Sequence, residues 1–227
     1  MPVKNLLRKV VPANVRSLVL RSIPRIKYIN TYVLRRNGII ENLTEIDKKF
    51  VIRKINLEDA DKLKKAYSFR SEKYFLRNGL PRLNNQSWQG LAVIDSDTND
   101  IAYVSWVILK NVDFIDDLKI KLGKNQFFVR DGYCVPTYRH QGLHTRMEQE
   151  RINFCVRNGA NSIFVLIENK NEKGKISVIE NGFKLFQQNI YLVIPAFGVY
   201  HEFFTALKYP FKSLVKRIKS LGNVTKD

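Results

Sequence analysis

The sequence predicts an α/β (α+β) fold, built as a mixed, mostly antiparallel central sheet with helices on both of its faces. Two β-like runs, residues 88–94 and 101–110, are joined by a six-residue polar connection and are expected to form a hairpin. From residue 126 to residue 195 the pattern changes to strand, helix, strand, helix, strand. Strands first, followed by strand–helix alternation, are typical of a mixed sheet covered by helices.

The individual elements follow from local signals. Residues 50–55 are expected to form the first strand, and Asn56 is suited to cap the helix that follows. A second helical segment, residues 71–78, is expected to end at Gly79 and Pro81 because these residues disfavour a helix interior. The remaining strands are expected at residues 126–135, 162–168 and 184–195, the remaining helices at 145–158 and 174–180, and an acidic insertion at 111–125.

The middle of the chain and its two ends differ in composition, because both ends are strongly basic. The 227 residues are 44% hydrophobic, which suffices for one medium domain with extensions. Of the net charge of +18, most lies at the ends: residues 1–40 hold nine Lys and Arg and no acidic residue, and residues 200–227 hold six against two acidic residues. The predicted organisation is a basic amphipathic N-terminal extension (1–45), a central domain (46–198) and a basic amphipathic C-terminal helix or tail (199–227).

The basic ends indicate several kinds of partner. No run reaches the roughly 18–20 apolar residues that a membrane span needs, and Arg16 and Arg21 interrupt any signal peptide. A basic helix at residues 203–221 would pack on the domain, lie on an anionic membrane surface, or bind an acidic partner such as an acyl-carrier protein. Nucleic acid is disfavoured because the ends carry no Gly-rich or aromatic-repeat motif. We therefore expect a cytoplasmic protein, with a peripheral position at the inner face of the membrane as the alternative that the charge supports.

Cysteine usage indicates thiols rather than a metal site. Cys134 lies in a strand-like run and Cys155 in a helix-like run, and neither belongs to a CxxC or a Cys/His pair at zinc spacing. We expect both thiols to be buried in a reducing compartment, and we expect no bound metal.

The segment 136–144, which reads Pro-Thr-Tyr-Arg-His-Gln-Gly-Leu-His, is the strongest functional signal. It joins a predicted strand to a predicted helix, and the first N–H groups of a helix have no intrahelical partner and bind anions. Gly142 allows close approach of the backbone to a ligand, and Arg139 adds positive charge. There is no Gly-Lys-Ser/Thr, which excludes a P-loop. The expected ligand is a phosphate or pyrophosphate.

This loop resembles the acyl-CoA pyrophosphate loop of the GNAT acyltransferase superfamily, which typically reads Val-x-Pro-x-Tyr-Arg-x-x-Gly-Leu/Ile-Gly. The resemblance extends over residues 50–198, where loop, helix, strand, Asn-containing turn, helix, Gly-Phe and strand follow in the family's order. It implies an N-acetyltransferase that takes acetyl-CoA as donor and a primary amine as acceptor. The matching loop residues are Pro136, Tyr138, Arg139, Gly142 and Leu143, while His144 replaces the usual small residue.

The resemblance also implies which residues hold the cofactor. The main chain of Cys134 and Val135 would hold the pantetheine arm edge to edge. Asn171 would bind the same arm, and its spacing to Gly182 favours it over Asn169. Contacts to the pyrophosphate would come from Arg139, His140, Gln141, Gly142, Leu143 and His144.

Asp131 and Tyr133 are the leading catalytic candidates. Alternation along the strand places Asp131, Tyr133 and Val135 on one face. Burial would raise the pKa of the Asp131 carboxyl towards that of a useful base. The alternatives are a salt bridge from Asp131 to a neighbouring arginine and a core role for Tyr133. The arginine in this salt bridge would be Arg130 or Arg139. The opposite face of the strand would carry Arg130, Gly132 and Cys134.

Glu168, at the end of the fifth strand, is the third catalytic candidate, with a solvated strand end as its alternative. The Tyr that often precedes the family's Gly-Phe glycine by four residues is Val178 here. The usual general acid is therefore missing, and Tyr191 or water would replace it.

The pairing of Tyr103 and Trp106 with Asp131-x-Tyr133-x-Val135 resembles GNAT members of bacterial surface-polysaccharide synthesis. It implies an amino sugar, free or nucleotide-linked, as acceptor. Two alternatives stay open: a long-chain N-acyltransferase supplied by an acyl-carrier protein, and a non-catalytic module that binds CoA or a phosphate ligand and attaches to membrane or nucleic acid through its basic ends.

Overall fold

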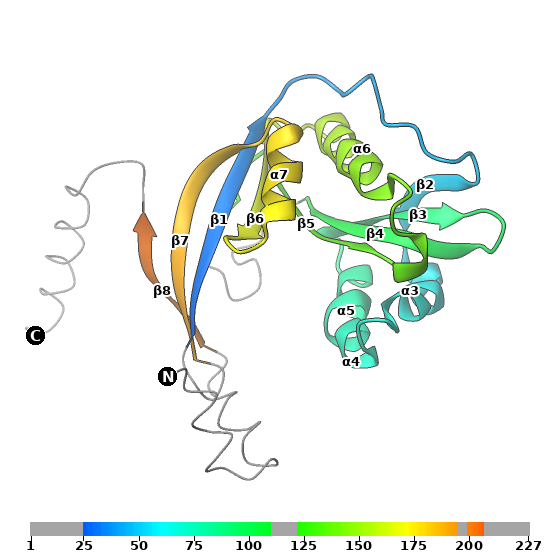
Figure 1. The fold of residues 1–227 in the computed structure, drawn as a ribbon, viewed down its shortest axis with the longest axis horizontal. Helices are drawn as coiled ribbons and strands as arrows, with labels where there is room; N and C mark the ends of the chain where they lie inside the picture. Colours follow the sequence, from blue (N-terminus) through cyan, green and yellow to red (C-terminus); the bar gives the residue numbers. More distant parts are fainter. Residues whose placement is uncertain (1–24, 110–121, 195–198, 207–227) are drawn as a thin grey trace, which may run out of the picture. The chain divides into compact units, whose positions relative to one another are not determined.

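The computed structural model describes residues 25–109, 122–194 and 199–206 (Figure 1). The chain divides into two compact units. The larger unit comprises Tyr32–Leu166 and Glu172–Lys184, and the smaller comprises Met1–Thr31, Ile167–Asn171 and Leu185–Asp227. Each unit is described by itself.

The larger unit contains the mixed sheet that the sequence predicts. Antiparallel pairs join β2 to β3, β3 to β4 and β4 to β5, and β5 pairs in parallel with β6. Helix α6 (Leu143–Arg157) connects the two parallel strands. The strands are β2 (Phe50–Ile55), β3 (Trp88–Asp95), β4 (Asp100–Ile108), β5 (Gln126–Cys134) and β6 (Ser162–Glu168), of which β6 ends in the smaller unit.

Helices cover both faces of this sheet. Helix α6 lies over one face, and the helices α3 to α5 lie over the other (Figure 1). The core on the second face is built around Trp106, which is fully buried and donates a hydrogen bond from Nε1 to the hydroxyl of Tyr67 at 3.0 Å. Burying the two aromatic side chains with their polar groups paired avoids the cost of an unsatisfied donor.

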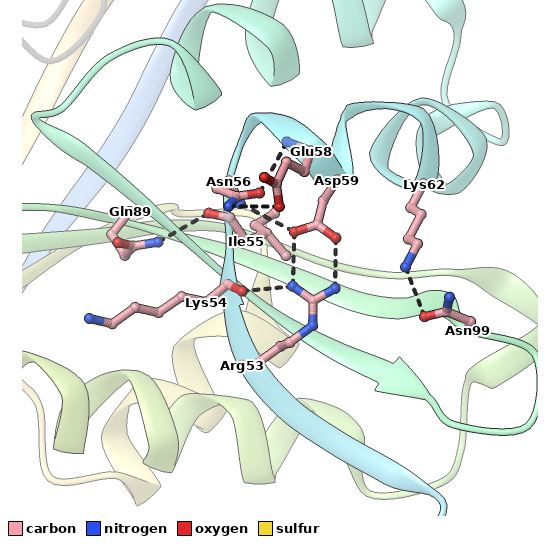
Figure 2. Close-up of polar contacts among 9 residues, drawn as sticks. All are labelled: Arg53, Lys54, Ile55, Asn56, Glu58, Asp59, Lys62, Gln89 and Asn99. Carbon is pink, nitrogen blue, oxygen red and sulfur yellow. Dashed lines mark hydrogen bonds and ion pairs between the residues drawn. The ribbon is translucent and has the colours of Figure 1, made fainter.

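The junction between β2 and the first helices is held by a capping box, as the N-cap prediction for Asn56 requires (Figure 2). The Asn56 side chain accepts from the backbone N–H of Glu58 at 3.0 Å, and Asp59 accepts from the backbone N–H of Asn56 at 3.2 Å. Arg53 of β2 donates to both oxygens of the Asp59 carboxylate, from Nη1 to Oδ2 at 2.8 Å and from Nη2 to Oδ1 at 2.6 Å. A 3-10 turn, Leu57–Asp59, then leads into α3 (Ala60–Tyr67).

The predicted end of the second helical segment at Gly79 and Pro81 is wrong. Helix α4 (Glu72–Tyr74) continues through a π-helical turn, Phe75–Gly79, into α5 (Leu80–Leu83). Pro81 is the second residue of α5 and directly follows the π-helical turn, in which the N–H of Leu80 bonds to the carbonyl of Phe75. Gly79 is needed for packing, because a Cβ there would lie 2.9 Å from the Phe75 ring.

The rest of the larger unit follows the sequence closely. Helix α6 begins at Leu143, two residues earlier than expected. Helix α7 (Glu172–Glu180) buries Val178 and ends before Gly182, whose φ of +85° suits a glycine.

The smaller unit is formed by strands. It contains most of β1 (Arg25–Arg35) and of β7 (Lys184–Ile194), together with β8 (Val199–Ala206). Strands β7 and β8 pair antiparallel from Gln188↔Ala206 to Ile194↔Val199.

These strands correct one expectation about the chain ends. Residues 203–206 belong to β8 instead of opening a helix. Residues 25–35, in the predicted N-terminal extension, form β1. The basic C-terminal segment forms a strand here because hydrogen bonding to β7 outweighs its local helix propensity. The remainder of both ends (1–24 and 207–227) and most of the acidic insertion (110–121) lie outside the described residues.

Candidate active site

Strand β5 contains a bulge at the candidate catalytic residues. Val104 of β4 pairs with Tyr133, and Trp106 pairs with Arg130. Ser105 alone therefore faces two residues of β5, Asp131 and Gly132, which is the two-against-one count of a β-bulge. Asp131 has a φ of +58°, in the left-handed region that few residues other than Gly, Asn and Asp adopt.

The bulge coincides with the end of the pairing between β5 and β6. The ladder runs from Gln126↔Ser162 to Val129↔Val165. Beyond it, in the part of the chain that the structure describes, residues 131–134 have no recorded β6 partner. One main-chain edge of β5 can therefore bind an extended ligand in the way that a further strand would bind.

The bulge also changes which side chains share a face. Tyr133 lies in the core with Tyr67, and the carboxylate of Asp131 contacts residues of the same helices, as predicted. Arg130 pairs with Trp106 and stacks over Trp88 at 5.9 Å, so it lies on this face too. Its predicted position on the opposite face is wrong, because strict alternation fails where one strand gains a residue.

The loop that follows β5 forms the predicted helix N-terminus. A 3-10 turn, Pro136–Tyr138, leads to His140 and Gly142, whose φ angles are +64° and +73°. The first bond of α6 runs from the N–H of Arg146 to the carbonyl of Gly142 at 3.2 Å. The N–H groups that precede Arg146 are therefore available to an anion. Arg139, His140, Gln141 and Gly142 are exposed, and Leu143 is buried beneath them.

Asp131 is ion-paired on the face covered by α3 to α5. Its Oδ2 accepts from Arg82 Nη1 at 2.5 Å and from the Tyr74 hydroxyl, and its Oδ1 accepts from Arg70 Nη1 at 3.1 Å. Burial alone would raise the pKa of this carboxyl, but the two guanidinium groups and the Tyr74 hydroxyl outweigh it and lower the pKa to about 2.

The expectation that Asp131 has a raised pKa is therefore wrong. Of the two interpretations that the sequence left open, the salt bridge is confirmed. Its recorded partners are Arg70 and Arg82, whereas the sequence suggested the neighbours Arg130 and Arg139.

Tyr133 is a core aromatic whose ring also supports a cation. Its side chain is buried, its ring lies 5.7 Å from that of Tyr67, and the guanidinium of Arg70 lies 4.2 Å over it. Burial is the main cause that raises the pKa of the Tyr133 phenol, so the hydroxyl stays protonated at neutral pH.

His144, at the start of α6, connects three elements. Its Nδ1 lies 2.7 Å from the hydroxyl of Tyr103 on β4, and its Nε2 lies 3.1 Å from Ser177 Oγ on α7. Burial lowers the pKa of the His144 imidazole, which keeps the ring neutral at pH 7. The buried Tyr103 hydroxyl has no other recorded hydrogen-bond partner among the described residues. It therefore donates to Nδ1, and Nε2 carries the proton that reaches Ser177.

Comparison with solved structures identifies the fold to which this arrangement belongs. The chain is similar to a Drosophila protein (TM-score 0.56, 15% identity, 80% of this chain and 57% of that chain). It is similar to a GCN5-related N-acetyltransferase from Sphaerobacter thermophilus (0.54, 11%, 79% and 55%). It is also similar to a tandem GNAT protein from the clavulanic acid biosynthesis pathway (0.55, 10%, 88% and 59%).

The chain has the GNAT fold. It spans less than two thirds of the length of each of these three proteins. No protein-family model and no curated protein sequence matches it. The fold and the resemblance predicted from the sequence are confirmed.

Within the GNAT fold, two predicted site residues belong to the smaller unit. The backbone N–H of Asn171 donates to the carbonyl of Glu168 at 2.8 Å, so the two residues form one turn after β6. The side chain of Asn169 instead accepts from Asn30 at 3.2 Å. The positions of Glu168 and Asn171 relative to the loop at the start of α6 stay predictions.

The remaining positions considered for proton transfer are Val178, Tyr191 and the two cysteine thiols. Val178, which stands where many GNAT proteins have a Tyr, is buried in the core. The side chain of Tyr191, its suggested replacement, lies outside the described side chains. Burial raises the pKa of the half-buried Cys134 thiol and, to about 12, that of the fully buried Cys155 thiol.

The described ranges contain no group of three or more His, Cys, Asp or Glu side chains that could hold a metal ion. Within the same ranges, no helix combines the length and apolarity needed to cross a membrane.

Proposed function

We propose that the protein is an acyl-CoA-dependent N-acyltransferase that moves an acetyl group from acetyl-CoA to a primary amine. The observation that carries this proposal is the combination, in a GNAT fold, of an open main-chain edge on β5 with the exposed N-terminus of α6 directly after it. The first element can hold an extended pantetheine arm, and the second can hold a pyrophosphate.

The donor would bind along this path in order. The main chain of Cys134 and Val135 would bond the pantetheine arm. The loop from Arg139 to His144 would bind the pyrophosphate through its N–H groups and the Arg139 charge. The reaction needs no metal, because the thioester is already an activated acyl group.

The transfer is a direct attack. The ammonium group of the acceptor first loses a proton to water. The amine nitrogen then bonds to the thioester carbon, the carbon–sulfur bond breaks and the sulfur leaves as a thiolate. The thiolate takes up a proton, and the nitrogen, which is positively charged after the attack, releases one to water. His144 donates from Nε2 to Ser177, which leaves the Ser177 hydroxyl proton free to point to the departing sulfur. In this proposal His144 and Ser177 together take the role of the tyrosine whose position Val178 occupies. Asp131 acts as a fixed anion, since its carboxylate is saturated with donors.

The proposed acceptor is an amino sugar of surface-polysaccharide synthesis. Support comes from Trp106, Asp131 and Tyr133, three members of the pairing that suggested this class of acceptor, which lie on one face of the sheet. Tyr103, a fourth member, lies on the other face, where it bonds to His144. The basic ends would suit an anionic membrane surface or an acyl-carrier protein. A higher rate with a long-chain acyl-carrier protein than with acetyl-CoA would replace the donor in this proposal.

The cofactor site is tested with two left-handed glycines. Gly142→Ala is expected to weaken acetyl-CoA binding by about ten-fold, because its φ of +73° costs an L-residue roughly 1–2 kcal/mol and the loop relaxes. Gly159→Ala, at φ +85° with nothing within 4 Å, carries the same strain at the other end of α6 and should leave binding unchanged. Calorimetry and the thermal shift with acetyl-CoA measure both.

A ligand at about 100 times its dissociation constant should stabilise the wild type by about 2.7 kcal/mol. ATP is the control for nonspecific anion binding. No shift with acetyl-CoA or CoA in the wild-type protein would overturn the proposal. Equal losses in the two glycine variants would overturn the place of the loop in it.

His144 is tested by chemical rescue. His144→Ala is expected to lower kcat by about 100-fold with little change in the KM for acetyl-CoA, because the main-chain N–H groups remain. Since half of the side chain is exposed (51%), added imidazole should enter the space and restore part of the rate. His140→Asn is the matched control, an exposed loop histidine whose loss should give no imidazole response. A purely structural role for His144 would show no rescue.

A further inference from the structure

The ion-paired cluster on the face of β5 covered by α3 to α5 carries a surplus of positive charge. One carboxylate, Asp131, is shared by two guanidinium groups, those of Arg70 and Arg82. Among the described residues, no second carboxylate is recorded in contact with either arginine. An amine acceptor is itself a cation at neutral pH, so this surplus opposes its binding unless the acceptor also brings negative charge.

The two arginines differ in what they can do. Arg82 is 6% exposed and lies over the rings of Trp88 and Trp106 at 4.7 and 5.6 Å, so its charge serves Asp131. Arg70 is 27% exposed and donates one recorded hydrogen bond, to Asp131. A guanidinium has five N–H donors, and the other donors of Arg70 have no recorded acceptor among the described residues.

Aromatic rings hold the Arg70 guanidinium in a fixed place. Its carbon lies 4.2 Å over the ring of Tyr133, 4.6 Å over that of Tyr74 and 5.7 Å over that of Tyr67. Stacking on a ring covers the face of a guanidinium but leaves its N–H edge open to a planar or tetrahedral anion. The group is therefore preorganised, and binding an anion costs little side-chain entropy.

The position of Arg70 relates it to the reaction. It contacts both Asp131, in the bulge, and Tyr133, two residues further along β5. In the proposed function, the main-chain edge of this same stretch of β5 receives the thioester arm. An anion bound to Arg70 would place an attached amine beside that stretch.

We propose that Arg70 binds an anionic group of the acceptor, so that the substrate is a primary amine that also carries a phosphate or a carboxylate. This inference rests on the proposed acyl transfer and narrows its acceptor. Polycationic amines are excluded as good substrates by the same surplus charge.

The test compares three amino sugars that share one skeleton: glucosamine, glucosamine 6-phosphate and muramic acid, which carry no anion, a phosphate and a carboxylate. CoA release from acetyl-CoA gives kcat/KM for each. We expect at least one anionic acceptor to exceed glucosamine by about ten-fold or more, in line with a charge-assisted hydrogen bond to arginine. The preference should fall as ionic strength rises, and the better of the two anionic acceptors identifies the anion.

Arg70→Gln should reduce this preference to nearly one, and Arg70→Lys should keep part of it because the charge remains. Arg77→Gln is the control, since Arg77 is an exposed arginine of the neighbouring π-helical turn. Circular dichroism and Tm confirm that the variants fold. Equal rates for glucosamine and both anionic acceptors in the wild type, or an unchanged preference in Arg70→Gln, would overturn the inference.

Failure of the proposed function looks different. If acetyl-CoA neither binds nor reacts, calorimetric titration of the three amino sugars into the wild type and Arg70→Gln still decides the inference about Arg70. Binding of an anionic amino sugar that Arg70→Gln removes would support the anion site alone. Equal or absent binding of all three would overturn it.

Discussion

Asp131→Asn is expected to lower the free energy of unfolding by about 3 kcal/mol, one of the two largest effects that we expect from a single change. The substitution keeps the size of the side chain but removes the charge that Arg82 and Arg70 share. Arg82, 6% exposed, would then be a buried cation without a counter-ion. The measurement is urea denaturation at pH 7.

The control is Asp100→Asn, which breaks an ion pair to Lys65, whose side chain is 70% exposed. An exposed pair contributes less than about 1 kcal/mol, so this variant should stay close to the wild type. Equal losses in the two variants would show that the Asp131 cluster contributes no more than a surface pair.

The same carboxylate makes the free energy of unfolding depend on pH in the acid range. Its pKa is about 2 in the folded protein and 3.8 in the reference state, so the native state favours the charged form. The resulting stabilisation, about 2 kcal/mol, is fully present above pH 3.8 and is lost as the pH falls through about 2. Asp131→Asn should remove this part of the acid sensitivity, and denaturation of both proteins at pH 5 and pH 2.5 measures it.

Gly132→Ala is expected to cost about 2 kcal/mol of stability and to impair donor binding, because the new Cβ would overlap the hydroxyl oxygen of Tyr103. Tyr103 is 1% exposed and bonded to His144, so its ring cannot move aside. The overlap lies in the bulge, at the main-chain edge proposed to hold the pantetheine arm. Denaturation and acetyl-CoA titration give the two effects.

Tyr103→Phe is combined with Gly132→Ala in a double variant to test this packing argument. It removes the overlapping oxygen and leaves the ring carbon at 3.3 Å, a close contact that a small shift relieves. The double variant should therefore regain more than half of the stability that Gly132→Ala loses, relative to Tyr103→Phe alone. Gly38→Ala, with nothing within 4 Å of the new Cβ, is the neutral control. Strict additivity in the double variant would contradict the packing argument.

Much of the fold could be predicted because its signals are local. Alternating apolar runs placed the strands β2 to β7, and Asn56 marked the start of the first helical segment through a capping box of four successive residues. The loop before α6 could be recognised because a strand, a left-handed glycine and a helix follow one another directly. The end at Gly79 and the strand β8 could not, since packing and pairing with distant residues outweigh local preference there.

The candidate site divides in the same way. From the sequence alone we could place the loop of Arg139 and Gly142 before a helix, the carboxylate at Asp131 and the absence of a Tyr at Val178. Only the tertiary structure gave Asp131 its partners, Arg82 and Arg70, which lie 49 and 61 residues away along the chain. Such distant charges decide the pKa, because electrostatic interaction depends on separation in space and on burial, and neither is written in the order of residues.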